Sequence, residues 1–229
     1  MSFLAIPFFG ENRILCASPL ISTSNLQVYC KLDGNANDSS GNGNNGVATS
    51  MTYGTGKFGS CGTFSSGKYI TLPTKAYGIA NNYTISAWIK SSYTGTTQFI
   101  LSADVVASAR VFQFKIEPNG DVYLVRFSST PAVVANFGAS SSVLNGQWHH
   151  IATTFNSAVG SIIYIDGLPS ATNSNTTLNN NTAGTKPIIG VFNDLTTAPM
   201  VGDIDDLSFW NRTLSATEIL TLAGNCPLT

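Results

Sequence analysis

The chain has 229 residues, of which 43% are hydrophobic and 10% are charged, and its formal net charge is −1. Soluble domains usually carry about 25% charged residues, so Asn, Ser, Thr and Gly must supply much of the polar surface. Nucleic-acid binding needs a basic patch, and no run of Lys or Arg is present. No apolar stretch approaches the ~20 residues of a membrane-spanning helix. These values exclude nucleic acid as a partner and a membrane span, and they favour one large all-β domain.

The first 24 residues differ from the rest of the chain. Residues 1–9 are apolar, but they lack a basic segment, Pro7 interrupts them and Glu11 follows, so they are not typical of a signal peptide. A virion protein, which leaves the cell without such a signal, would fit this start, as would a secreted protein whose signal has been removed. We expect residues 1–24 to form an irregular arm that packs on this domain or on a neighbouring subunit, because its apolar side chains would otherwise form an exposed patch.

Short alternating runs dominate the chain from residue 25 onwards. Residues 26–32 alternate apolar and polar side chains, which predicts a half-buried strand that ends at Asp33. Residues 83–90 predict a second strand, with Trp88 on the face opposite Ile85.

Two hairpins follow from turn residues between such runs. Asn119-Gly120 joins residues 112–116 to residues 122–125, and Asp166-Gly167 follows residues 162–165. Residues 188–192 and 204–210 predict further strands. Many short strands separated by Gly and Asn turns indicate a two-sheet antiparallel β-sandwich.

One short helix is predicted near the C-terminus. Ser215 and Glu218 form a capping-box pattern, apolar residues follow them, and Gly224 is placed to end the helix.

The four cysteines are Cys16, Cys30, Cys61 and Cys226, and they allow three pairings. None forms a Cys-x-x-Cys motif, so a structural zinc site is not expected. Buried free thiols remain as open as one or two disulfides.

Several segments in a fixed order resemble the laminin-G-like family of concanavalin A-like domains. The segments are residues 32–34, 38–43, 56–59, 69–73, 83–89, 148–152, 164–167, 202–207 and 210–215. The resemblance covers residues 25–223 and implies a jelly-roll domain over residues 25–229, often with one structural calcium ion. Members of this family occur as carbohydrate-binding modules, adhesion domains and appendages of enzymes or virions, so the fold leaves the function open.

The resemblance implies the ligands of that calcium ion. Asp33 ends the first strand and Asp205 starts the last, and the family places these strands side by side. We therefore expect Ca²⁺ to bind the side chains of Asp33 and Asp205 and a carbonyl near Gly46, with Asp206 on the opposite face. The alternative is ordinary turn chemistry without a metal.

The resemblance also implies a disulfide pairing, if disulfides form at all. The family places the strand after Cys61 near the strand of Cys30, and it places the first and last strands together. We expect Cys30 to pair with Cys61 and Cys16 to pair with Cys226.

Catalysis is not expected. A glycosidase needs two carboxylates that flank the bond, but the glutamates Glu11, Glu117 and Glu218 lie in the arm, a hairpin and the helix. His149 and His150 are adjacent on a predicted strand and point to opposite faces, so they cannot share one metal ion.

Aromatic side chains on an outer sheet face would suit sugar binding. Trp88, Tyr123 and Trp148 are the candidates, and the alternative for each is that it packs beneath a loop. Two functions are thus expected: a structural or assembly module such as a virion surface protein with possible glycan binding, or a secreted carbohydrate-binding adhesion module. The expected partners are accordingly a glycan or neighbouring structural subunits.

Overall fold

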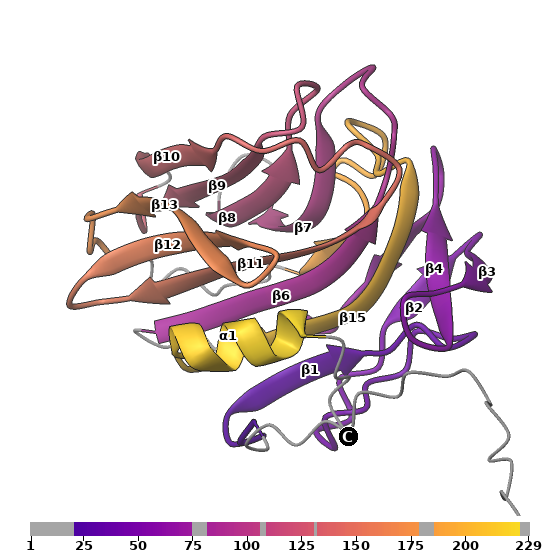
Figure 1. The fold of residues 1–229 in the computed structure, drawn as a ribbon, viewed down its shortest axis with the longest axis horizontal. Helices are drawn as coiled ribbons and strands as arrows, with labels where there is room; N and C mark the ends of the chain where they lie inside the picture. Colours follow the sequence, from indigo (N-terminus) through magenta and orange to yellow (C-terminus); the bar gives the residue numbers. More distant parts are fainter. Residues whose placement is uncertain (1–20, 75–81, 106–108, 131, 179–185, 225–229) are drawn as a thin grey trace, which may run out of the picture.

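The computed structural model describes residues 21–74, 82–105, 109–130, 132–178 and 186–224. In this part of the chain two antiparallel sheets face each other as a sandwich, with the helix α1 (Ala216–Ala223) below one of them (Figure 1). The predicted all-β jelly roll with a short C-terminal helix is therefore confirmed. No helix in the described ranges has the length and apolar character needed to cross a bilayer.

Eight of the described strands form one sheet, here called sheet A. Its order is β13-β12-β11-β6-β15-β4-β3, and β1 also pairs with β15. The bounds are β13 Leu168–Asn173, β12 Gly160–Ile165, β11 Trp148–Asn156, β6 Asn82–Lys90, β15 Gly202–Trp210, β4 Ser60–Phe64, β3 Thr52–Thr55 and β1 Leu26–Cys30.

Seven of the described strands form the second sheet, sheet B. Its order is β10-β9-β8-β7-β14-β5-β2. The bounds are β10 Val133–Ala139, β9 Val122–Phe127, β8 Ala109–Ile116, β7 Gln98–Val105, β14 Ile188–Ile189, β5 Tyr69–Thr71 and β2 Val47–Thr49.

The core lies between the two sheets, where alternate side chains of each strand meet. Tyr83 of sheet A stacks on Phe112 of sheet B with ring centroids 5.8 Å apart, and Phe112 stacks on Phe209 of β15 at 6.3 Å. Such pairs contribute about 0.5–1.5 kcal/mol beyond the burial of their area. The rings therefore help to fix the sheets face to face.

Both predicted hairpins are confirmed. Gly120 (φ +86°) turns the chain between β8 and β9, and Asp166 and Gly167 (φ +50° and +83°) turn it between β12 and β13. Positive φ at these positions matches the twist of the paired strands.

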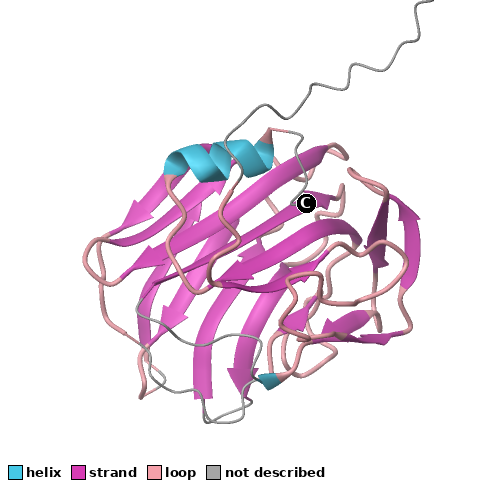
Figure 2. Cartoon of the chain, turned by 90° about the horizontal axis from the view of Figure 1, so that it is seen from below, coloured by secondary structure: helices cyan, strands magenta, loops and turns pink. Residues whose placement is uncertain are grey.

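The outer face of sheet A carries a second apolar cluster beneath α1. Tyr29, Trp210, Ile219 and Leu222 belong to it, and each is at most 6% exposed. Figure 2 shows α1 lying across one end of the strands. The strand β1 is consequently buried on both faces, rather than half-buried as its alternating pattern predicts.

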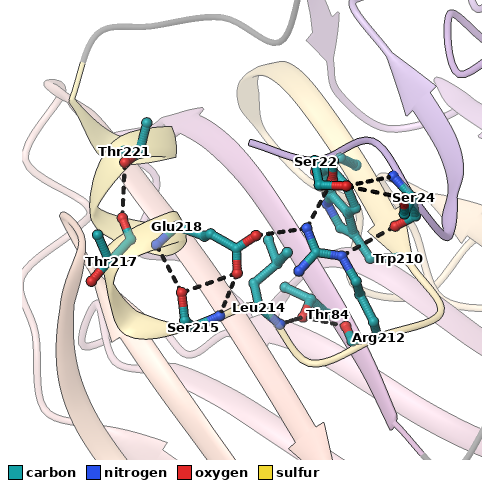
Figure 3. Close-up of polar contacts among 11 residues, drawn as sticks. Ser22, Ser24, Thr84, Trp210, Arg212, Leu214, Ser215, Thr217, Glu218 and Thr221 are labelled. Carbon is teal, nitrogen blue, oxygen red and sulfur yellow. Dashed lines mark hydrogen bonds and ion pairs between the residues drawn. The ribbon is translucent and has the colours of Figure 1, made fainter. Parts of the chain in front are cut away.

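Polar contacts hold α1 and the start of the described chain together (Figure 3). Ser215 and Glu218 form the predicted capping box. Arg212 donates to Glu218 Oε1 (2.7 Å), to the Ser22 carbonyl (2.8 Å) and to the Ser24 carbonyl (3.1 Å). The last residues of the predicted arm are thus fixed beside the helix, and residues 1–20 lie outside the described residues.

The expected disulfide between Cys30 and Cys61 is wrong, because both are buried free thiols. Cys30 points into the core between the sheets, whereas Cys61 follows the opposite alternation from the core residue Phe64 and faces outward. The two sulfur atoms therefore lie on different faces of sheet A. Cys16 and Cys226 lie outside the described residues.

One cation lies inside the sandwich. Arg126 of β9 is 3% exposed, and its guanidinium stacks 3.4 Å from the ring centroid of Phe155. It donates to the carbonyls of Asn175 (2.9 Å) and Thr177, and no carboxylate within the described ranges forms an ion pair with it. Backbone carbonyls of the segment after β13 therefore take the place of a counterion.

Candidate functional site

The three aromatic candidates lie on two different faces. Leu124 of β9 and Ile89 of β6 point into the core, so their neighbours Tyr123 and Trp88 point outward from sheet B and sheet A. Trp148 pairs with Lys90 in sheet A and shares the face of Trp88. The structure therefore separates Tyr123 from the two tryptophans by the full thickness of the sandwich.

Tyr123 is partly exposed, and the backbone of the neighbouring strand fixes its ring. Tyr123 is paired with Lys115 of β8 and with Gly138 of β10. A Cβ atom at Gly138 would lie 2.4 Å from Tyr123 Cε2, so the ring covers the space that a side chain would fill. Only glycine allows this close approach, which holds the ring against the sheet.

Amide side chains border Tyr123. The next row of sheet B pairs Gln113, Val125 and Asn136; Asn136 is exposed, whereas Gln113 is only 9% exposed. We call the surface formed by Lys115, Tyr123, Gln113, Asn136 and Gly138 the sheet-B face. It combines a fixed ring with hydrogen-bonding groups and has little charge, because Lys115 is paired with a carboxylate.

Glu117 is that carboxylate. Its Oε1 atom lies 2.6 Å from Lys115 Nζ, and its Oε2 atom accepts from Thr97 at 2.5 Å. Partial burial opposes ionisation, but these hydrogen bonds hold the pKa of Glu117 below its usual value. The other glutamate in the described ranges, Glu218, caps α1, so each has a structural partner.

Trp88 is 6% exposed and packs beneath a loop. The Lys57 ammonium lies 4.4 Å from its ring centroid, and Phe58 meets it edge-on at 6.0 Å. On the third side lies His150, at 5.4 Å. Trp88 therefore presents no open ring face for a sugar, as in the alternative considered above. Trp148 is partly exposed at the start of β11.

The two adjacent histidines have separate partners. His150 is buried, its Nε2 atom lies 2.8 Å from Ser86 Oγ, and burial lowers its pKa to about 4. His149 contacts Asp166 Oδ2 at 2.8 Å and Asn145 Oδ1 at 3.1 Å. The two rings thus have different partners, Ser86 for His150 and Asp166 with Asn145 for His149, which fits their adjacent positions on a strand.

Asp33 and Asp205 both hold the 56–60 turn. Asp33 Oδ1 accepts from Ser60 N at 2.7 Å, and Asp205 Oδ2 accepts from Phe58 N at 2.9 Å. Gly46 instead packs against Ala36 and Ile70, and its N–H bonds the Ala36 carbonyl. The structure thus brings the two predicted carboxylates to one turn. Gly46 contacts other residues, Ala36 and Ile70, instead of this turn.

Asp206 lies on the outer face of sheet A, like Asp205. The expectation that it points to the opposite face is therefore wrong. A bulge between Asp205 and Ser208 puts Asp206 at φ +48°, and its Oδ1 atom accepts from the Tyr29 hydroxyl at 2.7 Å on the outer face. Burial, with the nearby Asp33 charge, raises the pKa of Asp205 to about 6 and that of Asp206 to about 7.

These carboxylates fit a bound cation in part. Asp205 Oδ1 is buried without a hydrogen-bond partner, which is costly for a carboxylate. A cation would satisfy that oxygen and relieve the repulsion from Asp33. Within the described ranges, however, no three His, Cys, Asp or Glu side chains are grouped to hold a metal, so carbonyls and water would have to supply the other oxygens.

Sequence reasoning missed most of the sheet-B face. Lys115, Gln113, Asn136 and Gly138 become neighbours of Tyr123 only through strand pairing. The available signal was the alternation of residues 122–127, which places Tyr123 opposite the buried Leu124.

Comparisons with solved structures show the fold. Domain 4 of AbnA, a GH43 extracellular arabinanase from Geobacillus stearothermophilus, in complex with arabinotriose, is 22% identical with a TM-score of 0.71, over 87% of this chain and 98% of that one. The binding domain of Paraclostridial Mosquitocidal Protein 1 is 14% identical with a TM-score of 0.73, over 88% of this chain and 52% of that one. The botulinum neurotoxin serotype G binding domain is 18% identical with a TM-score of 0.69, over 87% of this chain and 51% of that one.

The chain spans about half the length of the two toxin binding domains, whereas it matches almost all of the arabinanase domain. A family model, Laminin_G_3, described as the concanavalin A-like lectin/glucanases superfamily, matches residues 64–220, which is more than half of the chain. The chain therefore belongs to the Laminin_G_3 family of the concanavalin A-like lectin/glucanase superfamily.

Proposed function

We propose that this domain is a non-catalytic glycan-binding module that holds its ligand on the sheet-B face. The observation that carries this proposal is the Tyr123 ring held across Gly138. A pyranose or furanose can stack its C–H face on such a ring, while amides such as Asn136 hydrogen-bond its hydroxyls. A ring that is already fixed loses little conformational entropy when a sugar binds.

The arabinanase domain supports the proposal, because it matches this fold over 98% of its length and its structure contains arabinotriose. We therefore take a neutral oligosaccharide as the first ligand to test.

The test compares Tyr123→Ala with Tyr93→Ala, which removes an exposed loop tyrosine as a control. Calorimetric titration with arabino-oligosaccharides and a panel of other neutral oligosaccharides should show at least tenfold weaker binding for Tyr123→Ala, equivalent to about 1.4 kcal/mol. Tyr93→Ala should bind as the wild type does. Equal affinity of Tyr123→Ala and wild type for every oligosaccharide that binds would remove the sheet-B face from consideration.

We propose that the module does not hydrolyse its ligand, because the carboxylate of Glu117 is held by Lys115 and Thr97. Incubation with the same oligosaccharides should yield no shorter products. Turnover that disappears in Glu117→Gln or Asp121→Asn would contradict this.

A second candidate is an assembly role, on a virion surface or another extracellular surface. It is supported by Leu168 and Leu220, which are 62% and 51% exposed, and Leu220 lies against Gly167, the residue before Leu168. Arg212 fixes residues 22–24, the last residues of the predicted arm, beside the same helix. Removal of residues 1–20 should reduce the mass of the particle in solution, and an unchanged mass and melting temperature would exclude a role of the arm in assembly.

We also propose one structural Ca²⁺ ion, held by Asp33 and Asp205. Its chemical contribution would be charge neutralisation that stabilises the 56–60 turn.

A further inference from the structure

Coverage of the outer face of sheet A falls off from one end of the strands to the other. Directly opposed residues of β15, β6 and β11 share this face and form four rows. From the α1 end, the rows are Trp210–Thr84–Thr154, Ser208–Ser86–Ala152, Asp205–Trp88–His150 and Asp203–Lys90–Trp148.

The first three rows are closed. Every residue in them is at most 6% exposed. The helix α1 and its apolar cluster cover the first two rows, and the 56–60 turn covers Trp88 through Lys57 and Phe58. The fourth row lies beyond both covers, and Asp203, Lys90 and Trp148 are each partly exposed.

The fourth row contains the ammonium group of Lys90, which forms no ion pair within the described ranges, although Asp203 lies opposite it on β15. Thr63 of β4 donates to Asp203 Oδ1 at 2.9 Å and continues the row. No carboxylate in the described part of the chain lies within ion-pair distance of Lys90, nor of Lys57, which lies in the turn that covers Trp88. The unpaired ammonium of Lys90 therefore belongs to the residue directly opposite the partly exposed Trp148, whereas the lysine of the sheet-B face is paired with Glu117.

We propose that the fourth row is a second binding site, for a carboxylate-bearing saccharide. The sugar ring would stack on Trp148, its carboxylate would pair with Lys90, and Asp203 and Thr63 would hydrogen-bond its hydroxyls. An ammonium beside an aromatic ring distinguishes an acidic sugar from a neutral one, because the charge-assisted bond is available only to the acidic sugar. The site is on the sheet opposite Tyr123 and does not depend on ligand binding there.

The first experiment measures binding of oligogalacturonate to the full chain, with neutral oligosaccharides of equal length for comparison. Lys90→Gln and Trp148→Ala should each weaken oligogalacturonate binding at least tenfold, and Trp148→Phe should retain more of it than Trp148→Ala. Lys186→Gln, which changes an exposed lysine outside the row, and Tyr123→Ala should bind as the wild type does. Melting curves of each variant show whether it is folded.

The tryptophans provide a second, direct readout. The chain has three, and Trp88 and Trp210 are buried, so acrylamide quenching reports mainly on Trp148. Saturating oligogalacturonate should protect this fluorescence from quenching, and Lys90→Gln should abolish the protection at the same concentration.

Three results would overturn the proposal: no binding of oligogalacturonate, unchanged affinity in Lys90→Gln, or loss of this binding in Tyr123→Ala alone. None of them affects the neutral-sugar test of the sheet-B face. Conversely, if Tyr123→Ala binds neutral sugars normally while Lys90→Gln loses oligogalacturonate, the sheet-B proposal fails and this one stands.

Discussion

His150 makes the stability of the domain depend on pH. Burial lowers its pKa from 6.5 to about 4, so between these values the unfolded chain binds a proton that the folded chain does not. The free energy of unfolding therefore falls as pH falls from 6.5 to 4, by at most about 1.4 kcal/mol per pH unit. His150→Gln lacks this dependence.

The measurement is urea unfolding of the wild type and His150→Gln at several pH values, so that all other groups cancel in the difference. As pH falls from 6.5 to 4, the wild type should lose more free energy of unfolding than the variant does. Above pH 7 the difference between the two proteins should be constant. A difference that is constant throughout would show that His150 is not buried as described.

Asp205 and Asp206 act with the opposite sign. Burial raises their pKa values to about 6 and 7, so without a cation the folded state loses stability as pH rises from about 4 to 7 and both ionise. A calcium ion would offset that loss, because it favours the ionised carboxylates.

We therefore expect calcium to raise the melting temperature by a few degrees at pH 8, and a chelator to reverse this. The effect should be smaller at pH 5, where protons compete with the ion. Asp205→Asn should remove the response, and Asp194→Asn, at an exposed loop carboxylate, should leave it intact. A wild-type melting temperature that calcium and chelator leave unchanged would support turn chemistry alone.

At this scale, alternation predicted where side chains point but not what covers them. The outward direction of Trp88 is confirmed, yet its cover comes from Lys57, about thirty residues away in the chain. Asp206 was misplaced because the bulge after Asp205 shifts the alternation by one residue, and no turn residue marks it. The neighbours of Tyr123 depend on strand register, which a single strand pattern does not contain.

Among the elements, β14 is short because Gly190 follows it in a conformation that favours glycine. Gly190 has φ +89°, and a Cβ atom there would lie 2.2 Å from Cδ1 of the buried Phe64. Gly67 has a similar φ of +78°, but a Cβ atom there would have nothing within 4 Å. A side chain at either position would strain the backbone, but only a side chain at position 190 would also clash with a neighbour. Comparing the two positions therefore separates the cost of strain from the cost of the clash.

Gly67→Ala should lower the free energy of unfolding by about 1–2 kcal/mol from the left-handed backbone alone. Gly190→Ala should lower it by about 1–3 kcal/mol more, because Phe64 must move within a packed core. Chemical denaturation measures both. Equal losses in the two variants would mean that Phe64 adapts freely.

Element types were predictable where local chemistry decides them. The capping box at Ser215 and Glu218 and the turns at Gly120 and Gly167 are confirmed. The run over residues 188–192 predicted a longer strand than the two-residue β14. Its composition is apolar throughout, but the positive φ at Gly190 ends the ladder after Ile189.

For the whole molecule, the two buried thiols report on global unfolding. Burial raises the pKa of Cys30 to about 12 and that of Cys61 to about 11, so neither forms a thiolate in the folded protein at pH 8. We expect a thiol reagent to modify both only at the rate of unfolding, with modified peptides identified by mass spectrometry. Rapid modification of Cys61 alone in native buffer would show that sheet A opens locally at β4.

The order of strands within the two sheets was the part least accessible to physical reasoning from the sequence. Periodicity and turn chemistry gave the sandwich class, while the jelly-roll topology came from the resemblance that the family match over residues 64–220 supports. Pairing between distant strands, such as β1 with β15, depends on packing across the whole domain.

Arg126 restricts where the chain can be opened for engineering. Its charge is balanced by the carbonyls of Asn175 and Thr177 alone among the described backbone, so new chain ends placed between those residues would release the carbonyls and leave a guanidinium in an apolar interior. A circular permutant opened there should fold poorly, although the segment is polar and lies in a loop. The turn at Ser66-Gly67 is the better place for new termini, because it is exposed and does not provide the carbonyls that bind Arg126.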